Sequence, residues 1–89
     1  MTAAFKNKKP TQVNVKSTVA DGLAVPFVGF NSYRILSENL EKMISLNEDY
    51  IALAILKMME IEKLVVEGAG ATPLAAILAG KVPELKGKT

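Results

Sequence analysis

The sequence predicts part of an α/β domain: a partial three-layer α/β/α arrangement around a parallel sheet. From residue 42 onward the pattern is strand, helix, strand, helix, an order that implies parallel strands joined by right-handed crossovers. Hydrophobic residues make up 49% of the 89 residues and charged residues 22%, the proportions of a globular chain. Because two strands make a poor sheet, we expect further strands of this sheet to lie outside these 89 residues.

The first third of the chain predicts little regular structure. Residues 2–9 have some helical character, which Pro10 should end. Residues 11–16 (TQVNVK) alternate apolar and polar side chains, a pattern that favours a short extended segment. Residues 17–29 are rich in turn formers and small residues but keep several apolar side chains, so we expect an ordered loop.

The middle of the chain predicts two helices with a strand between them. The first helix covers residues 31–40, with Asn31 or Ser32 as its cap, and residues 42–46 (KMISL) form the strand. Asn47 then caps the second helix, where apolar residues recur every three or four positions. These apolar positions are Ile51, Ala54, Ile55, Met58 and Met59.

A second strand and helix follow. Residues 64–66 form a short buried strand, and residues 67–71 (EGAGA) form a tight turn. Thr72 is expected to cap the next helix with Pro73 at its first position, where a missing N–H costs nothing. Gly80 should end that helix.

Composition excludes several classes of site. There is no cysteine and no histidine, which removes disulfides, thiol catalysis and the commonest metal ligand. The net charge is only +2 and several of the lysines lie near the two ends, so we expect no nucleic-acid partner. No apolar run reaches the ~18 residues that span a membrane, so a cytoplasmic protein without a membrane partner is expected. The acidic residues look like a solvated surface: Glu38, Glu41, Glu48 and Asp49.

Two small-residue turns are the candidate sites for chemistry. The turn at residues 67–71 follows a predicted strand, and ligands of open parallel sheets bind beyond the carboxyl ends of strands. Gly68 and Gly70 would let a ligand approach the backbone, although a closely packed turn explains the same residues. Asp21 and Gly22 lie in the other turn, where Asp21 as a simple local cap is the alternative.

Taken together, these turns resemble the serine/threonine dehydratase family. Residues 17–26 (STVADGLAVP) are similar to that family's T-[IL]-A-D-G-[LV]-A-V segment. About 45 residues later, residues 64–71 (LVVEGAGA) resemble its VVEGAGA strand and turn. Residues 47–51 (NEDYI) are similar to the [ST]-E-x-x-I opening of the helix between them, and the likeness covers nearly the whole chain. Threonine ammonia-lyase, serine dehydratase and serine racemase all share these parts.

The resemblance implies a fold-type II pyridoxal-phosphate enzyme with the tryptophan synthase β-like fold. Residues 1–89 would be an incomplete part of its large, cofactor-holding domain. Such enzymes hold pyridoxal 5'-phosphate on a lysine and eliminate water and ammonia from a small hydroxy amino acid, leaving a 2-oxo acid. By the resemblance, Gly22 lies against the cofactor ring, while Glu67, Gly68 and Gly70 lie beside it. Asp21 would lie near the substrate's hydroxyl group.

The resemblance also implies parts that these residues do not include. The family's Schiff-base lysine lies in a Ser-x-Lys-x-Arg segment, and a Ser-Gly-Gly-Asn turn meets the pyridine nitrogen; neither occurs here. We therefore expect no catalytic residue among the 89, and no activity from this chain alone. The alternatives are a truncated, non-catalytic paralogue and a serine racemase fragment. A complete enzyme of this kind is expected to be a homo-oligomer, and no metal site is expected within this segment.

Overall fold

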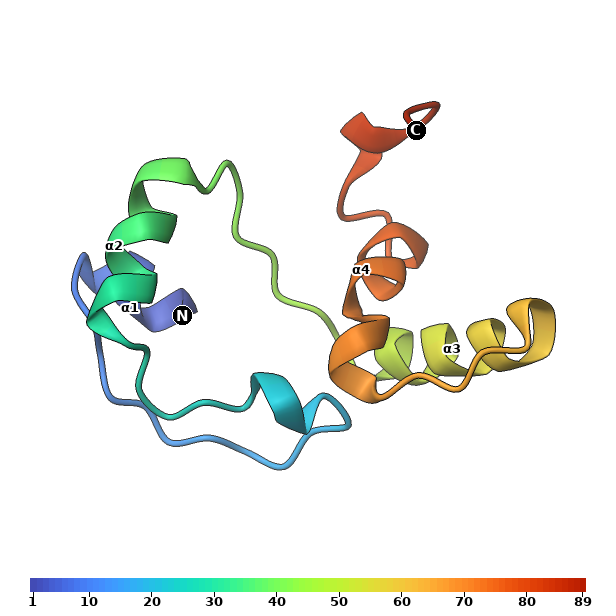
Figure 1. Ribbon diagram of the computed structural model, residues 1–89, viewed down its shortest axis with the longest axis horizontal. Helices are drawn as coiled ribbons and strands as arrows, with labels where there is room; N and C mark the ends of the chain where they lie inside the picture. Colours follow the sequence, from blue (N-terminus) through green and yellow to red (C-terminus); the bar gives the residue numbers. More distant parts are fainter. The chain divides into compact units, whose positions relative to one another are not determined.

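The computed structural model describes all of residues 1–89 and divides them into two compact units. Unit 1 comprises residues 1–16 and 24–43, and unit 2 comprises residues 17–23 and 44–89. Every regular element is helical (Figure 1). In chain order they are α1 (Thr2–Asn7), η1 (Asp21–Leu23), α2 (Phe30–Asn39), α3 (Glu48–Lys57), η2 (Met58–Glu62), α4 (Gly68–Leu78) and η3 (Pro83–Leu85).

Unit 1 holds α1 and α2. The α1 helix ends at Lys8, whose φ of 57° lies in the left-handed region, so the chain turns before Pro10 as the sequence predicted. Phe5 of α1 meets Tyr33 of α2 edge to face, with ring centroids 5.6 Å apart. This contact joins two helices that are far apart in the sequence.

The predicted cap of α2 is wrong. The helix begins one residue earlier than expected, with Gly29 as its N-cap and no side chain bonded to the free amides. Because Phe30 is already helical, Asn31 and Ser32 lie inside the first turn and cannot take the capping position. Residues 11–16 form no ladder; the Val13 amide donates to the Pro26 carbonyl at 2.8 Å.

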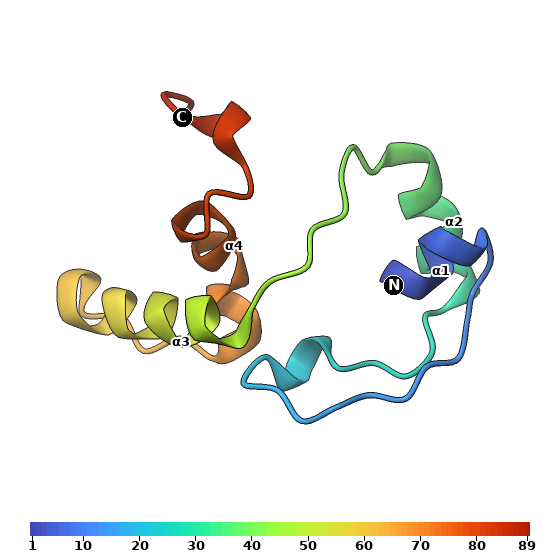
Figure 2. The ribbon, with the colours of Figure 1, turned by 180° about the vertical axis from the view of Figure 1, so that it is seen from behind.

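In unit 2, α3 begins where the sequence predicted. The Asp49 amide donates to Asn47 Oδ1 at 3.1 Å, which confirms Asn47 as the cap. The helix continues as the π-helical segment η2 and ends at Lys63, whose φ is 58°. The extended residues 64–66 then run back beside α3 (Figures 1 and 2).

The predicted start of α4 is also wrong. The helix begins at Gly68, so residues 68–71 are its first turn and not the tight turn that the sequence predicted. Pro73 therefore lies inside the helix, and Thr72 does not cap it. Pro73 has no N–H to give to the carbonyl of Ala69, four residues before it. Instead, the Thr72 hydroxyl donates to that carbonyl at 2.8 Å, which explains how a proline is accommodated here.

The predicted end of α4 is confirmed. Gly80 has a φ of +67°, and its amide donates to the Ile77 carbonyl at 3.0 Å. The next amide, of Lys81, donates to the Ala76 carbonyl at 3.0 Å. These two bonds form a Schellman motif, which glycine favours because it has no Cβ.

The core of unit 2 lies where α3, α4 and the loop before η1 (residues 17–20) meet, and it is built from small residues. The buried cluster is Ala20, Ile51, Ala54, Ala71 and Ala75. No large side chain is fully buried anywhere in the chain. Such a core removes little apolar surface from water, so the hydrophobic contribution to folding is small.

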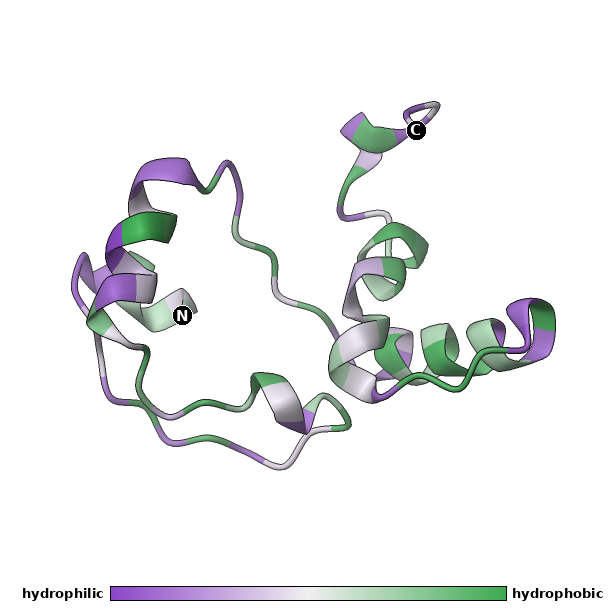
Figure 3. Cartoon of the chain, in the orientation of Figure 1, coloured by the Kyte–Doolittle hydropathy of each residue, from purple (hydrophilic) through white to green (hydrophobic).

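The predicted parallel sheet does not form within these 89 residues. Residues 42–46 and 64–66 are extended but have no strand partner, because the chain supplies no neighbouring strands. Leu46 and Val66 pack against the core of unit 2, but Leu64 and Val65 face solvent, at 51% and 89% exposed. Figure 3 shows that α3 and the segment after η2 are largely hydrophobic. None of the helices combines the length and the hydrophobicity that a membrane-spanning helix requires.

Candidate functional site

The structure brings the two small-residue turns together within unit 2. Gly22, in η1, lies against the start of α4: a Cβ built on it would be 3.2 Å from Ala69 Cβ and 3.9 Å from Glu67 Oε1. The amide of Leu23 donates to the Ala20 carbonyl at 2.9 Å, which fixes the shape of η1. Segments about 45 residues apart in the sequence thus form one continuous surface of backbone and small side chains.

Gly68 has a packing role that the sequence did not distinguish from ligand binding. A Cβ on this residue would overlap the carbonyl oxygen of Val19 and lie 3.0 Å from the Ala20 amide nitrogen. Because both atoms belong to backbone, neither can move aside cheaply. The closeness of the loop before η1 to the start of α4 therefore depends on glycine at this position.

The other predicted site residues lie at the surface of the same unit. Asp21, Gly22, Glu67 and Gly70 are exposed, and a Cβ on Gly70 would meet only Glu67 Cγ, at 3.9 Å. Gly22 joins the Glu67 turn directly, whereas Asp21 precedes it in η1.

This surface fits part of the expected cofactor. A planar ring can lie on backbone that carries no Cβ, and a carboxylate can meet a polar group on the ring's edge. The turns at residues 20–23 and 67–71 contain no lysine or arginine to balance a phosphate charge. The two turns therefore suit the ring rather than the phosphate group.

Two residues of this region were missed by the sequence argument. Thr18 donates its hydroxyl hydrogen to Glu48 Oε1, and the Val19 amide donates to Glu48 Oε2 at 2.9 Å. Glu48 was expected to belong to a solvated surface; it is exposed, but it binds the loop that carries Asp21 and Gly22. The sequence does contain both partners: an acidic residue directly after the helix cap Asn47, and a threonine shortly before the Ala-Asp-Gly turn.

The same hydrogen bonds change the acidity of Glu48. The bond from the Thr18 hydroxyl, and secondly that from the Val19 amide, hold the pKa of this carboxyl below its ordinary value, while desolvation opposes them weakly. Glu48 is therefore a carboxylate at neutral pH and can accept both bonds.

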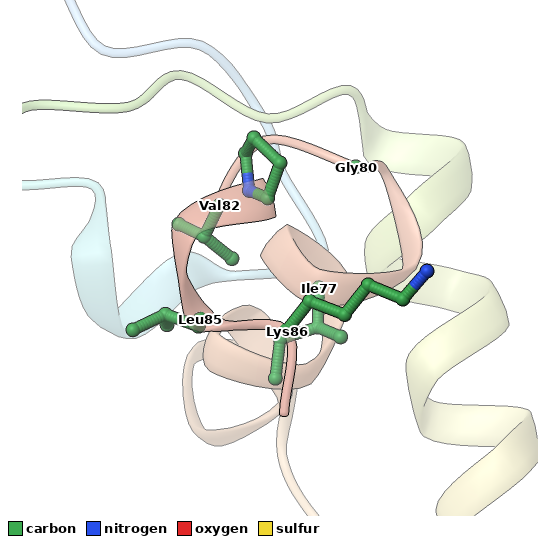
Figure 4. Close-up of a pocket in the computed structure, with 6 residues that line it drawn as sticks. Ile77, Gly80, Val82, Leu85 and Lys86 are labelled. Atoms are coloured by element: carbon green, nitrogen blue, oxygen red, sulfur yellow. The ribbon is translucent and has the colours of Figure 1, made fainter. Parts of the chain in front are cut away.

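A separate cavity of about 270 Å³ lies between the end of α4 and η3 (Figure 4). Its lining is Ile77, Gly80, Val82, Pro83, Leu85 and Lys86. The amino group of Lys86 points away from Val82 and Leu85, so the polar end of that side chain does not enter the cavity. The cavity shares no residue with the two turns.

The two curated proteins described below, which are similar in sequence, are named as a threonine ammonia-lyase and a threonine dehydratase. The chain is 47% identical over 86 residues to an L-threonine ammonia-lyase of Geobacter sulfurreducens. The match covers 97% of this chain and 21% of that protein. It is 37% identical over 82 residues to a catabolic L-threonine dehydratase of Staphylococcus aureus, covering 92% of this chain and 24% of that protein. The chain thus spans about a fifth to a quarter of the length of these curated relatives.

Solved structures agree with the sequence relatives. A threonine deaminase from the organism abbreviated T.th. superposes with a TM-score of 0.83 at 26% identity, covering 90% of this chain and 30% of that one. A serine racemase of Dictyostelium discoideum gives a TM-score of 0.78 at 32% identity, covering 94% and 26% respectively. Residues 1–89 all match one protein family, described as pyridoxal-phosphate dependent enzyme. The chain belongs to this family, whose members depend on pyridoxal phosphate.

Proposed function

We propose that this chain is a segment of a pyridoxal-phosphate-dependent L-threonine/L-serine ammonia-lyase, which converts a hydroxy amino acid into a 2-oxo acid with loss of water and ammonia. The observation that carries the proposal is the contact of Gly22 with the Glu67 turn, since it joins the two motifs that resemble this family. The 47% identity to a threonine ammonia-lyase supports the same reaction.

Each site residue has a proposed task. When bound, the cofactor withdraws electrons from the substrate's α-carbon, which eases removal of its proton. Gly22 lets the backbone approach the ring face, and Glu67 places a carboxylate at the ring edge; Gly68 and Gly70 keep the turn beside it small. Asp21, one residue before Gly22, holds the substrate's side-chain hydroxyl group. The lysine that binds the cofactor comes from residues outside these 89.

The extended segments have a structural task in the complete enzyme. Residues 42–46 and 64–66 join the parallel sheet of the large domain, with neighbouring strands supplied by the rest of the protein. This explains why Leu64 and Val65 are exposed here, at 51% and 89%. The complete enzyme is proposed to be a cytoplasmic homo-oligomer.

A chimera tests the proposal. The matching segment of the Geobacter threonine ammonia-lyase is replaced by this chain, and 2-oxo acid formation from L-threonine and L-serine is measured. We expect 2-oxo acid from at least one substrate, and a large loss of activity on Glu67→Ala. A chimera that folds and binds pyridoxal phosphate but forms no 2-oxo acid would contradict the proposal.

Two alternatives give different results. The serine racemase match, at 32% identity, predicts that the chimera converts L-serine into D-serine faster than into 2-oxo acid. A truncated paralogue predicts that transcripts from the source organism encode no lysine-bearing Ser-x-Lys-x-Arg segment upstream of Met1. Transcript sequencing outward from both ends of the segment decides this second case.

A further inference from the structure

The carboxylate of Glu48 holds three consecutive residues of the loop before η1. Its Oε1 accepts from the Thr18 hydroxyl, and its Oε2 accepts from the Val19 amide at 2.9 Å. The Thr18 hydroxyl oxygen in turn accepts from the Ala20 amide at 3.1 Å. One side chain at the start of α3 therefore binds this stretch of backbone both directly and through the Thr18 hydroxyl.

The opposite side of the same backbone is held by α4. The Val19 carbonyl lies against Gly68, where no Cβ could fit, and the Ala20 side chain is only 3% exposed. The Val19–Ala20 peptide is therefore fixed between the first turns of α3 and α4. Because the Leu23 amide donates to the Ala20 carbonyl, the position of Gly22 in η1 follows from the position of this peptide.

The neighbouring acid, Asp49, provides a natural comparison. Both Glu48 and Asp49 lie in the first turn of α3, where negative charge interacts favourably with the helix dipole. Both are exposed, but only Glu48 binds the loop. Charge at the start of α3 is therefore shared by the two residues, whereas contact with the loop belongs to Glu48.

We propose that Glu48 is a positioning residue for the reaction proposed above: by binding Thr18 and Val19, it fixes Gly22 beside Glu67 and so sets the spacing between the backbone under the ring and the carboxylate at its edge. This role depends on the proposed function, because it concerns the geometry of that site. In this role Glu48 acts through Thr18 and Val19 and not by a contact of its own with cofactor or substrate.

The test compares Glu48→Gln with Asp49→Asn in the chimera. Glutamine keeps one acceptor oxygen but presents an NH₂ group to the second donor, and both substitutions remove one charge from the same helix turn. For Glu48→Gln we expect kcat for L-threonine to fall on the order of tenfold or more with a smaller change in KM, since a misplaced site costs rate. Asp49→Asn should leave both close to their original values.

Thr18 supplies a second pair of variants. Thr18→Val removes the hydroxyl at constant shape and should reproduce the effect of Glu48→Gln, whereas Thr18→Ser keeps the hydroxyl and should restore activity. In the cofactor-free chimera, the Val19 and Ala20 amides should exchange on the order of tenfold faster in Glu48→Gln and Thr18→Val. The absorption spectrum of bound pyridoxal phosphate should change in the same two variants only.

Each outcome of these experiments either supports or overturns the positioning role of Glu48. If Glu48→Gln and Asp49→Asn behave alike in kcat, spectrum and exchange, the positioning role is overturned. Faster exchange with unchanged kcat and spectrum also overturns it, because the loop would then be held without positioning the site. If no chimera has lyase activity, the proposed function fails, and the role of Glu48 is judged by the spectrum: a change in Glu48→Gln and Thr18→Val but not in Asp49→Asn supports it, and no change overturns it.

Discussion

The Cα of Gly68 lies directly against the carbonyl group of Val19, with no space for a Cβ between them. Gly68→Ala should therefore separate the loop from α4 or shift the helix, at a cost of about 1–3 kcal/mol, the range for overpacked sites. The denaturant midpoint of the chimera measures this loss.

Gly70→Ala is the matched control for that substitution. Gly70 is in the same helix, but a Cβ there would meet only Glu67 Cγ at an ordinary 3.9 Å. Replacing this helical glycine should stabilise the chimera by about 0.4–1 kcal/mol through the unfolded state. Equal effects of the two substitutions would show that Gly68 is not confined by Val19.

A pH titration of Glu48 should reveal the hydrogen bonds from the loop. Because its pKa is lowered from 4.5, the stabilisation from Glu48 is complete above that value and is lost as pH falls through the lowered pKa. The stability difference between the parent chimera and Glu48→Gln should therefore shrink as pH falls below 4.5.

Thr18→Val removes the first cause of that shift and should move the pKa of Glu48 back toward 4.5. Carboxyl NMR of labelled protein follows this titration directly. An unchanged pKa in Thr18→Val would mean that the Thr18 hydroxyl does not bind Glu48 in solution.

Thr72 and Pro73 should be energetically coupled. Thr72→Val leaves the Ala69 carbonyl without its donor and should cost about 1 kcal/mol. In a Pro73→Ala background the restored amide can bond that carbonyl, so the same change should cost less. A double-mutant cycle on the chimera measures the difference, and strictly additive effects would contradict the compensation.

A charged substitution at Val65 should destabilise the fold only when the segment is part of a complete enzyme. It is 89% exposed in this chain, so Val65→Asp leaves the contacts of the segment itself intact. In the chimera, where residues 64–66 are proposed to join the sheet of the large domain, it should prevent folding or cost several kcal/mol, because a buried strand cannot hold an unpaired charge. Asn14→Asp, in an exposed polar position of an extended segment, is the control, and soluble yield is the measurement.

Local signals predicted the helix ends that depend on neighbouring residues. Asn47 caps α3 and Gly80 ends α4 as expected, since each acts on backbone groups within a few positions of itself. Thr72 and Pro73 predicted the wrong start for α4. The helix already begins at Gly68, which packs against a loop nearly 50 residues earlier in the sequence. No pattern near α4 records that contact.

The candidate site was also predicted only in part, because local motifs are visible in the sequence and contacts between distant segments are not. The small-residue turns around Gly22 and Glu67 were recognisable as motifs, and the structure brings them together. The tie between Thr18 and Glu48 was missed, because an acid in a first helical turn has a sufficient local explanation in the helix dipole. The predicted strands at residues 42–46 and 64–66 are absent from the structure, since neither segment pairs with another extended segment of this chain.

The alanine cluster of unit 2 has a consequence for how α3 and α4 find their alignment. Four of its five buried residues are alanines, so the two backbones approach closely at this point. Sliding α3 by one turn would bring Ile51 or Met58 to the place of Ala54, whose fully buried side chain is a single methyl group. Alignment is thus selected by exclusion of volume more than by attraction, and it can survive even while most of the surrounding apolar surface still lacks its partners.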